Sequence, residues 1–163
     1  MKKSNIKNLC LTAVFTAIVY VFTAYFHIPS HTGYTHVGDA FIYLSACLLP
    51  LPYAIFVGAV GALLADVLTG FAIWAPASII IKTVTVLFFT SKSAKIMSAR
   101  NLFALLPSAI TCFVGYYTYE AIFFSNFIAA AAGLIGYATQ SVLSSLLFVL
   151  LGISLDKINI KNI

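Results

Sequence analysis

Long stretches without a single charged side chain constrain this chain more than any other feature. Residues 8–26 and 127–152 contain no Asp, Glu, Lys or Arg, and a helix needs roughly 20 apolar residues to cross a bilayer. Over all 163 residues only 8% are charged and 62% are hydrophobic, whereas an ordinary soluble domain has about 25% charged residues. The sequence therefore predicts an all-α integral membrane protein that folds as one membrane domain over residues 1–163.

Six apolar segments are predicted to cross the membrane as helices. They are separated by the polar stretch HIPSHTGYTHVG, the turn Pro50-Leu51-Pro52, a turn before Pro76, the basic stretch SKSAKIMSARN and a short connection near Ser125. The predicted spans are about 8–26, 39–49, 52–69, 76–90, 101–125 and 127–152. The second span is short, which is typical of a half-depth or strongly tilted helix.

The basic residues predict how the chain is oriented. They gather before the first span, between the fourth and fifth, and after the sixth: Lys2, Lys3, Lys7, Lys92, Lys95, Arg100, Lys157 and Lys161. The loops on the opposite side contain no Lys or Arg. The positive-inside rule then predicts that both termini are cytoplasmic. It also explains the net charge of +5 without nucleic-acid binding.

Several ionisable and amide side chains fall inside the predicted spans. Counting residues from the outer helix ends places Asp66, Lys82 and Glu120 in the outer half of the membrane, with Gln140 near the middle and Asp39 at the outer surface. A charge at the centre of a span costs at least about 2.5 kcal/mol, so such residues usually mark function. Their gathering in one half predicts a cavity that opens outward.

Aromatic residues with polar tips accompany these groups at helical spacing. Aromatic faces combined with a few hydrogen-bonding groups are typical of a small-molecule pocket. The candidate ligand-binding residues are Tyr34, Asp39, Asp66, Trp74, Lys82, Tyr116, Glu120, Tyr137 and Gln140.

Structural roles for the same residues stay open at this point. Asp66 and Lys82 can pair with each other to hold a helical hairpin, and Trp74 can belong to an interfacial aromatic belt. Tyr137 and Gln140 can serve as hydrogen-bonding contacts between helices. For Glu120 a ligand contact is favoured, because the only base inside the membrane is Lys82.

Catalysis and metal binding are not predicted. The histidines His27, His31 and His36 all fall in the first outer loop, where a polar lid is favoured over a metal site. No pairing of a nucleophile with a base was found inside the spans, so the chain is not expected to be an enzyme. No metal and no cofactor are predicted.

A pair of small residues marks one face of the first span. Ala13 and Ala17 are four residues apart, and small residues at that spacing let another helix approach closely. Packing within the chain is the alternative explanation.

The sequence of residues 33–84 resembles that of a known family. The stretch GYTHVGDAFIYLSACLLP and the later stretch GAVGALLADVLTGFAIWAPASIIIKTV are similar to substrate-binding S components of energy-coupling factor (ECF) transporters. They are closest to the hydroxymethylpyrimidine and pyridoxine-type branch. The specific elements are Gly38-Asp39, Ala65-Asp66, Trp74-Ala75-Pro76 and Lys82.

This resemblance implies a function and a set of partners. S components bind a vitamin or precursor from outside, associate with a transmembrane coupling subunit and two cytoplasmic ATPase subunits, and are thought to topple in the bacterial cell membrane to release the cargo inside. Ala13 and Ala17 would then contact the coupling subunit. The chain has no P-loop, so ATP hydrolysis would lie in the partners.

Several substrates are compatible with the sequence. The branch suggests hydroxymethylpyrimidine or a vitamin B6 vitamer, and a queuosine precursor, riboflavin and thiamine remain alternatives. A different class is a stand-alone proton-coupled transporter in which Asp66 or Glu120 carries the proton. A non-transporting membrane scaffold is a third class, disfavoured by the clustered charges.

Overall fold

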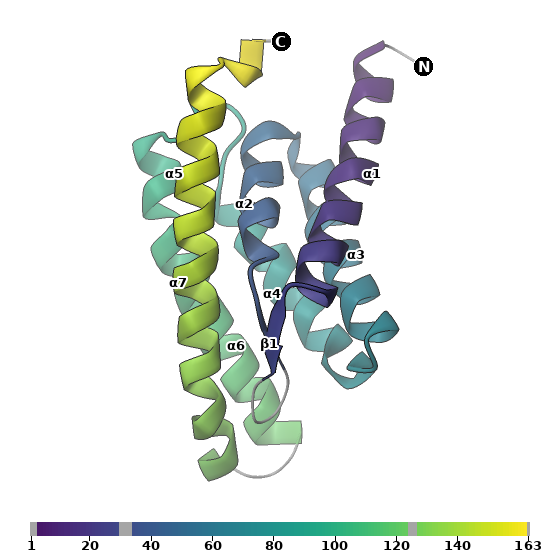
Figure 1. Ribbon diagram of the computed structural model, residues 1–163, viewed down its shortest axis with the longest axis vertical. Helices are drawn as coiled ribbons and strands as arrows, with labels where there is room; N and C mark the ends of the chain where they lie inside the picture. The colour runs from purple at the N-terminus through teal and green to yellow at the C-terminus, as the bar shows by residue number, and fades with distance from the viewer. Residues whose placement is uncertain (1–2, 30–33, 124–126, 163) are drawn as a thin grey trace.

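The protein is a bundle of helices with one small hairpin, seen in a computed structural model that describes residues 3–29, 34–123 and 127–162 (Figure 1). The helices in chain order are α1 (Lys3–Ala24), α2 (Asp39–Leu48), α3 (Leu51–Leu68), α4 (Ala75–Phe88), α5 (Ala99–Phe103), α6 (Leu105–Phe123) and α7 (Phe127–Lys157). Two single turns of 3-10 helix, η1 (Ala72–Trp74) and η2 (Ile160–Asn162), complete the described helical elements.

The predicted outer loop contains a two-stranded antiparallel sheet. Strand β1 (His27–Pro29) pairs with β2 (Tyr34–His36), with His27 opposite His36 and Pro29 opposite Tyr34. The protein is 82% helical, in agreement with the predicted class, and this short hairpin is an addition that was not predicted. Strands of three residues are too short to give a periodic hydrophobic signal, so the sequence pattern alone did not reveal them.

Helix lengths support a membrane protein. Within the described part of the chain, four helical stretches are long and apolar enough to cross a membrane, namely Asn5–Ala24, Leu51–Leu68, Ala99–Phe123 and Ala130–Lys157. Two shorter apolar stretches, Asp39–Leu48 and Ala72–Phe88, lie between them in the chain. At 1.5 Å per residue, α2 is about 15 Å long, roughly half the thickness of a hydrocarbon core. Six crossings therefore stay a prediction, with α2 as the short one.

Three predicted spans differ from the helices observed. The first was predicted to begin near residue 8, but α1 begins at Lys3. The fifth, predicted as one segment, is interrupted at Ala104 between α5 and α6. The sixth was predicted to end at Gly152, but α7 continues to Lys157. Glycine usually marks a helix end, whereas here the packing of Leu155 against the core extends the helix beyond it.

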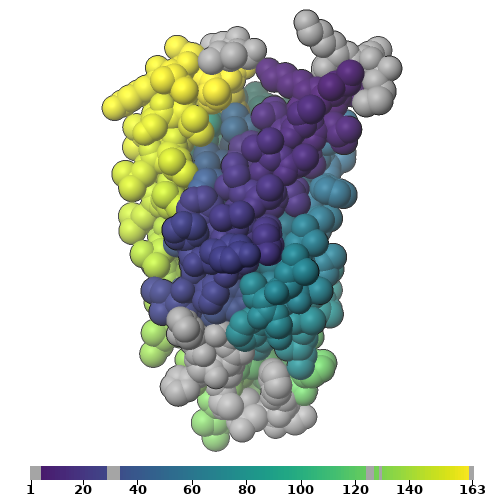
Figure 2. Space-filling view, turned by 45° about the vertical axis from the view of Figure 1, so that its right-hand side comes forward, coloured from purple at the N-terminus to yellow at the C-terminus, as the bar shows by residue number. Residues whose placement is uncertain are grey.

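Helix α1 lies on the outside of the bundle, against α3. Figure 2 shows it running obliquely across the surface. The two helices approach closely at Gly61, because a Cβ atom added there would lie 2.7 Å from the side chain of Val19. A residue other than glycine would push α1 away from the bundle.

Helix α2 is enclosed by the others. All of its residues except Phe41 and Leu48 are buried, including the polar Asp39 and Ser45. Because α2 begins at Asp39, directly after the hairpin, its first turn carries a carboxylate into the interior. This arrangement positions the polar groups of the site.

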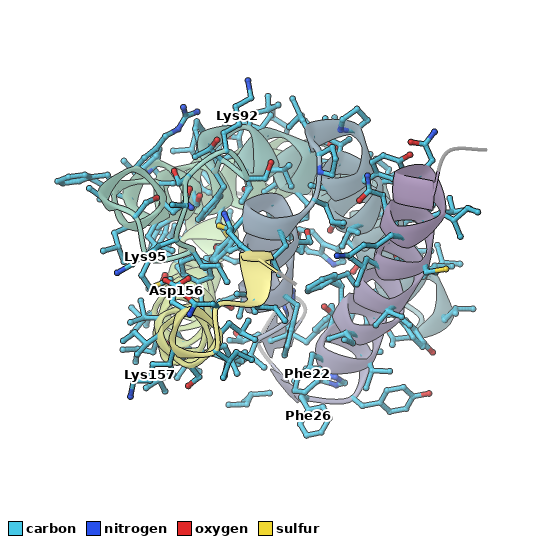
Figure 3. The ribbon with its side chains drawn as sticks, turned by 90° about the horizontal axis from the view of Figure 1, so that it is seen from above. Phe22, Phe26, Lys92, Lys95, Asp156 and Lys157 are labelled. Atoms are coloured by element: carbon cyan, nitrogen blue, oxygen red, sulfur yellow. The ribbon has the colours of Figure 1, made fainter. Side chains whose placement is uncertain are left out.

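The start of α1 and the end of α7 lie at the same end of the molecule, and the hairpin lies toward the other (Figure 1). At the end with the termini, Figure 3 shows Lys92, Lys95 and Lys157 projecting from the periphery. Asp156 fastens the preceding loop there, because its two carboxylate oxygens accept hydrogen bonds from the backbone N–H groups of Ile96 and Met97, each at 2.8 Å. This gathering of basic residues supports the predicted orientation, which stays a prediction.

Candidate ligand-binding site

A partly open cavity lies near the hairpin, where the ends of several helices meet. Its empty volume is about 430 Å³ with the open mouth included. The described lining residues come from β2, α3, η1, α4, α6 and α7: Tyr34, Thr35, His36, Asp66, Trp74, Ser78, Tyr116, Gly136, Tyr137 and Gln140. Elements far apart in the chain therefore build a single site.

Asp66 provides the carboxylate of the cavity wall. It sits in the last turn of α3 and is 5% exposed. The hydroxyl of Tyr34 donates a hydrogen bond of 2.6 Å to its Oδ1 atom. Its Oδ2 atom is buried and has no hydrogen-bond partner among the described residues. One oxygen thus anchors the hairpin to α3, and the other remains free to accept.

Three aromatic side chains form another part of the wall. The rings of Tyr116 and Tyr137 stack with centroids 5.3 Å apart and planes at 20°. Trp74 meets Tyr116 edge-on at 6.2 Å, and the Tyr116 hydroxyl shares a 2.9 Å hydrogen bond with Ser78. Trp74 is only 7% exposed, so it lies in the cavity wall and does not belong to an aromatic belt facing lipid.

Beneath the cavity lies a buried ion pair between α2 and α4. The ammonium group of Lys82 lies 2.8 Å from Oδ1 and 2.9 Å from Oδ2 of Asp39, and both side chains are nearly inaccessible. Gln140 donates a 2.9 Å hydrogen bond to the same carboxylate. The nitrogen of Lys82 also lies 5.2 Å from the centre of the Tyr116 ring.

The partner of Lys82 is therefore Asp39, and a pair between Lys82 and Asp66 is wrong. The sequence analysis placed Asp39 at the outer surface and predicted no pair between it and Lys82. In the fold, the chain enters the bundle directly after the hairpin, so Asp39 begins α2 in the interior. Asp66 instead pairs with Tyr34.

Glu120 lies beside the cavity, and is absent from its described lining residues. Its Oε2 atom accepts a 2.8 Å hydrogen bond from Tyr137, which does line the cavity. Its Oε1 atom is buried with no hydrogen-bond partner in the described part of the chain. Gly133 makes this arrangement possible, because a Cβ atom there would lie 2.9 Å from Oε2. A ligand contact for Glu120 stays a prediction.

The structure adds Thr35 and His36 to the lining residues. The Nδ1 atom of His36 accepts a 3.2 Å hydrogen bond from the backbone N–H of Gly38. Burial lowers the pKa of His36 to about 4, so the imidazole is neutral at neutral pH. Their position next to Tyr34 in the sequence was the available signal. However, the hairpin that turns Thr35 and His36 inward was not predicted.

Metal ligation has no support in the described residues, where no three His, Cys, Asp or Glu side chains are grouped suitably. His31, one of the three histidines considered, lies outside those residues.

The nine candidate residues thus divide into three groups. Six line the cavity: Tyr34, Asp66, Trp74, Tyr116, Tyr137 and Gln140. Asp39 and Lys82 form the ion pair below it, and Glu120 supports Tyr137 from the side. The ligand role of each residue remains a prediction.

Apolar helices around a small cavity with aromatic walls define the class: a multi-pass membrane protein with a candidate small-molecule site. Residues 3–157 match the family model described as ECF-type riboflavin transporter, S component. The chain belongs to this family and is a transport protein of the ECF type. No curated protein matches the chain.

Family membership confirms the resemblance to an S component but does not confirm the predicted branch. The matching description names riboflavin, one of the alternative substrates considered above. It also implies association with ECF transmembrane and ATPase subunits and a small vitamin as cargo.

Proposed function

We propose that this chain is the riboflavin-binding S component of a bacterial ECF importer and takes its ligand from outside the cell. The observation that carries the proposal is the cavity that combines Asp66 with the aromatic rings of Trp74, Tyr116 and Tyr137. It occurs in a chain that matches the riboflavin S component family over residues 3–157. A flat heteroaromatic ring suits such walls, because aromatic faces attract one another in stacked or edge-on arrangements.

The chemistry of riboflavin fits the remaining polar groups. Its isoalloxazine ring carries an N–H group flanked by two carbonyls, and its ribityl tail carries hydroxyls. Asp66 can accept a hydrogen bond, whereas Ser78, Tyr116 and Gln140 can donate as well as accept. The vacant Oδ2 atom of Asp66 is the natural acceptor for a ring N–H.

Hydroxymethylpyrimidine is the second candidate, followed by a vitamin B6 vitamer. The local resemblance of residues 33–84 supports them, and the exocyclic amine of the pyrimidine can also donate to Asp66. Thiamine and a queuosine precursor share a hydrogen-bonding heterocycle and belong in the same test. A stand-alone proton-coupled transporter and a scaffold are disfavoured by family membership.

The proposed partners would dock on α1. Ala13 and Ala17 are both exposed on this helix, while Thr12, Thr16 and Val19 face the bundle. A small-residue face on a surface helix (Figure 2) lets another membrane helix approach closely. We therefore propose this face as the contact for the transmembrane coupling subunit, with two cytoplasmic ATPases supplying the energy.

The test is a ligand titration on purified protein. The flavin's own fluorescence is expected to fall on binding, because stacking against tyrosine or tryptophan quenches it. Saturable binding with one flavin per chain is expected, and pyridoxine, hydroxymethylpyrimidine, thiamine and a queuosine precursor serve as competitors. Mass spectrometry of the purified protein would identify any ligand retained from the cell.

Two outcomes would contradict the proposal. Tight binding of another vitamin with no binding of riboflavin would keep the S component function but change the substrate. A chain that binds none of these compounds would contradict ligand capture by this cavity.

A further inference from the structure

The cavity holds one acceptor atom that the protein itself does not use. Asp66 is buried, its Oδ1 atom accepts a hydrogen bond from the hydroxyl of Tyr34, and Ser78 lies close to the same carboxyl group. Its Oδ2 atom is equally buried and accepts no hydrogen bond from the described residues. A buried polar atom without a partner is costly, so native proteins usually satisfy it, and a ligand is one way to do so.

The Asp66 carboxyl group also forms no ion pair with any of the described residues. No lysine or arginine is among the described lining residues. Lys82, the nearest buried base, is held by both oxygens of Asp39 below the cavity. His36 accepts a hydrogen bond through Nδ1 from its own loop and lies buried, which favours its neutral form. The site therefore favours a hydrogen-bond donor or a cation over an anion.

Neighbouring acceptors are already occupied or lie elsewhere. The Oδ2 atom of Asp39 accepts hydrogen bonds from Lys82 and Gln140, and its Oδ1 atom lies 2.8 Å from the Lys82 nitrogen. Glu120 has a vacant Oε1 atom, but it stands behind Tyr137 and is not among the lining residues. Asp66 is thus the one carboxylate among the described residues that lines the cavity with an oxygen to spare.

We propose that Asp66 Oδ2 selects the ligand by accepting a hydrogen bond from an N–H or amino group on the edge of its aromatic ring. Tyr34 holds the carboxylate in place through Oδ1, while the rings of Trp74, Tyr116 and Tyr137 contact the ring of the ligand. The substrate class is then a neutral or cationic heteroaromatic ring with a donor edge. This inference rests on the proposed function and specifies how that site discriminates between ligands.

The experiment uses two matched pairs of ligands with the full-length purified protein. The first pair is riboflavin and its N3-methyl derivative, which lacks the ring N–H. The second is 4-amino-5-hydroxymethyl-2-methylpyrimidine and its analogue without the amino group. Each ligand is titrated against the wild type, Asp66→Asn and Asp156→Asn.

In the wild type, removing the donor from the ligand is expected to weaken binding by about tenfold or more, the usual effect of losing a hydrogen bond to a charged group. Asp66→Asn keeps an oxygen for Tyr34 but presents an amide to the ligand. It is expected to weaken the binding of the donor-bearing ligand. The ratio of the two dissociation constants within each pair should then move toward one. Asp156→Asn makes the same substitution near the C-terminal end of α7, away from the cavity. It should preserve the wild-type ratio of dissociation constants.

Equal binding of both members of the pair by the wild type would overturn the inference and leave the proposed function standing. An unchanged ratio in Asp66→Asn would do the same. If neither pair bound to the wild type, the proposed ligand-binding function would fail with it. The comparison of matched ligands on the wild type remains decisive even if Asp66→Asn fails to fold.

Discussion

Lys82 shows how one buried side chain depends on a distant one. Its ammonium group is 2% exposed and is held by Asp39, which is 43 positions away in the chain. Removing one partner of a buried pair leaves the other charge without compensation, which costs more than the pair itself contributes. The pair therefore stabilises the floor of the cavity as long as both members are present.

Replacing the lysine tests this dependence. Lys82→Met keeps much of the side-chain volume but leaves the buried Asp39 carboxylate without its counter-ion. We therefore expect the free energy of unfolding to fall by about 3–5 kcal/mol. Thermal unfolding of the purified protein measures it. The double variant with Asp39→Asn should recover part of the loss, and Lys92→Met, at an exposed lysine, is the control. A double variant less stable than Lys82→Met would contradict this account.

His36 predicts how stability depends on pH. Burial in the hairpin lowers its pKa from 6.5 to about 4, while Asp39 opposes that shift and Lys82 and His27 add to it. The unfolded chain binds a proton near pH 6.5 but the folded chain only near pH 4, so lowering the pH through this window favours unfolding. The contribution of His36 to stability is complete above about pH 6.5.

We expect the wild type to lose up to about 3 kcal/mol of stability between pH 6.5 and 4 through this residue. His36→Gln, which retains an acceptor for the Gly38 N–H, should show a shallower decline. Thermal unfolding as a function of pH measures both. Parallel curves for the wild type and the variant would contradict a neutral, buried His36.

At the scale of elements, the sequence predicted different properties of α1 and α2. The sequence predicted α1 as an apolar span, and its exposed Ala13 and Ala17 agree with a small-residue face. The sequence also predicted that α2 is short, but not that it is enclosed by the other helices. A helix with no charged residue after Asp39 gives no sign of which neighbours surround it.

The face of α1 should matter for assembly but not for ligand binding. We expect Ala13→Phe combined with Ala17→Phe to reduce co-purification of the coupling subunit and ATPases, because bulky rings keep a second helix away. Flavin titration should remain unchanged, since neither alanine lines the cavity. Ala132→Phe, at an exposed alanine on α7, is the matched control. Normal assembly of the double variant would place the docking surface elsewhere.

At the scale of the whole molecule, the exposed basic residues and the cavity lie toward opposite ends. The loop with Lys92 and Lys95 and the end of α7 form the end that carries the termini, with Lys157 beside them (Figure 3). The hairpin that contributes Tyr34 and His36 to the cavity lies toward the other end (Figure 1). If the basic end is cytoplasmic, the cavity opens outward.

Cysteine labelling in intact cells measures this orientation. Tyr25→Cys, near the hairpin and 69% exposed in the wild type, should react with a membrane-impermeant thiol reagent. Lys95→Cys, in the exposed basic loop, should react only after the cells are opened. Both variants are made with Cys10→Ser, because Cys10 is exposed. The reverse pattern would invert the predicted topology.

The sequence alone determined the properties that depend on composition and local pattern. Charge-free runs identified a helical membrane protein, basic clusters predicted its orientation, and residues 33–84 identified an S component, which family membership confirms. Each of these signals is carried by neighbouring residues or by their spacing along one helix. They remain readable without knowing how the helices pack.

Only the tertiary structure decided which polar groups are partners. It joined Lys82 to Asp39 rather than Asp66, brought Tyr34 from the hairpin to Asp66, and set Glu120 behind Tyr137. Buried polar atoms need partners, but the sequence does not say which ones, because any acid of similar depth could satisfy the same base. Packing made that choice: the hairpin directed α2 into the bundle, and Asp66 was placed in the cavity wall with its Oδ2 atom buried and without a hydrogen-bond partner among the described residues.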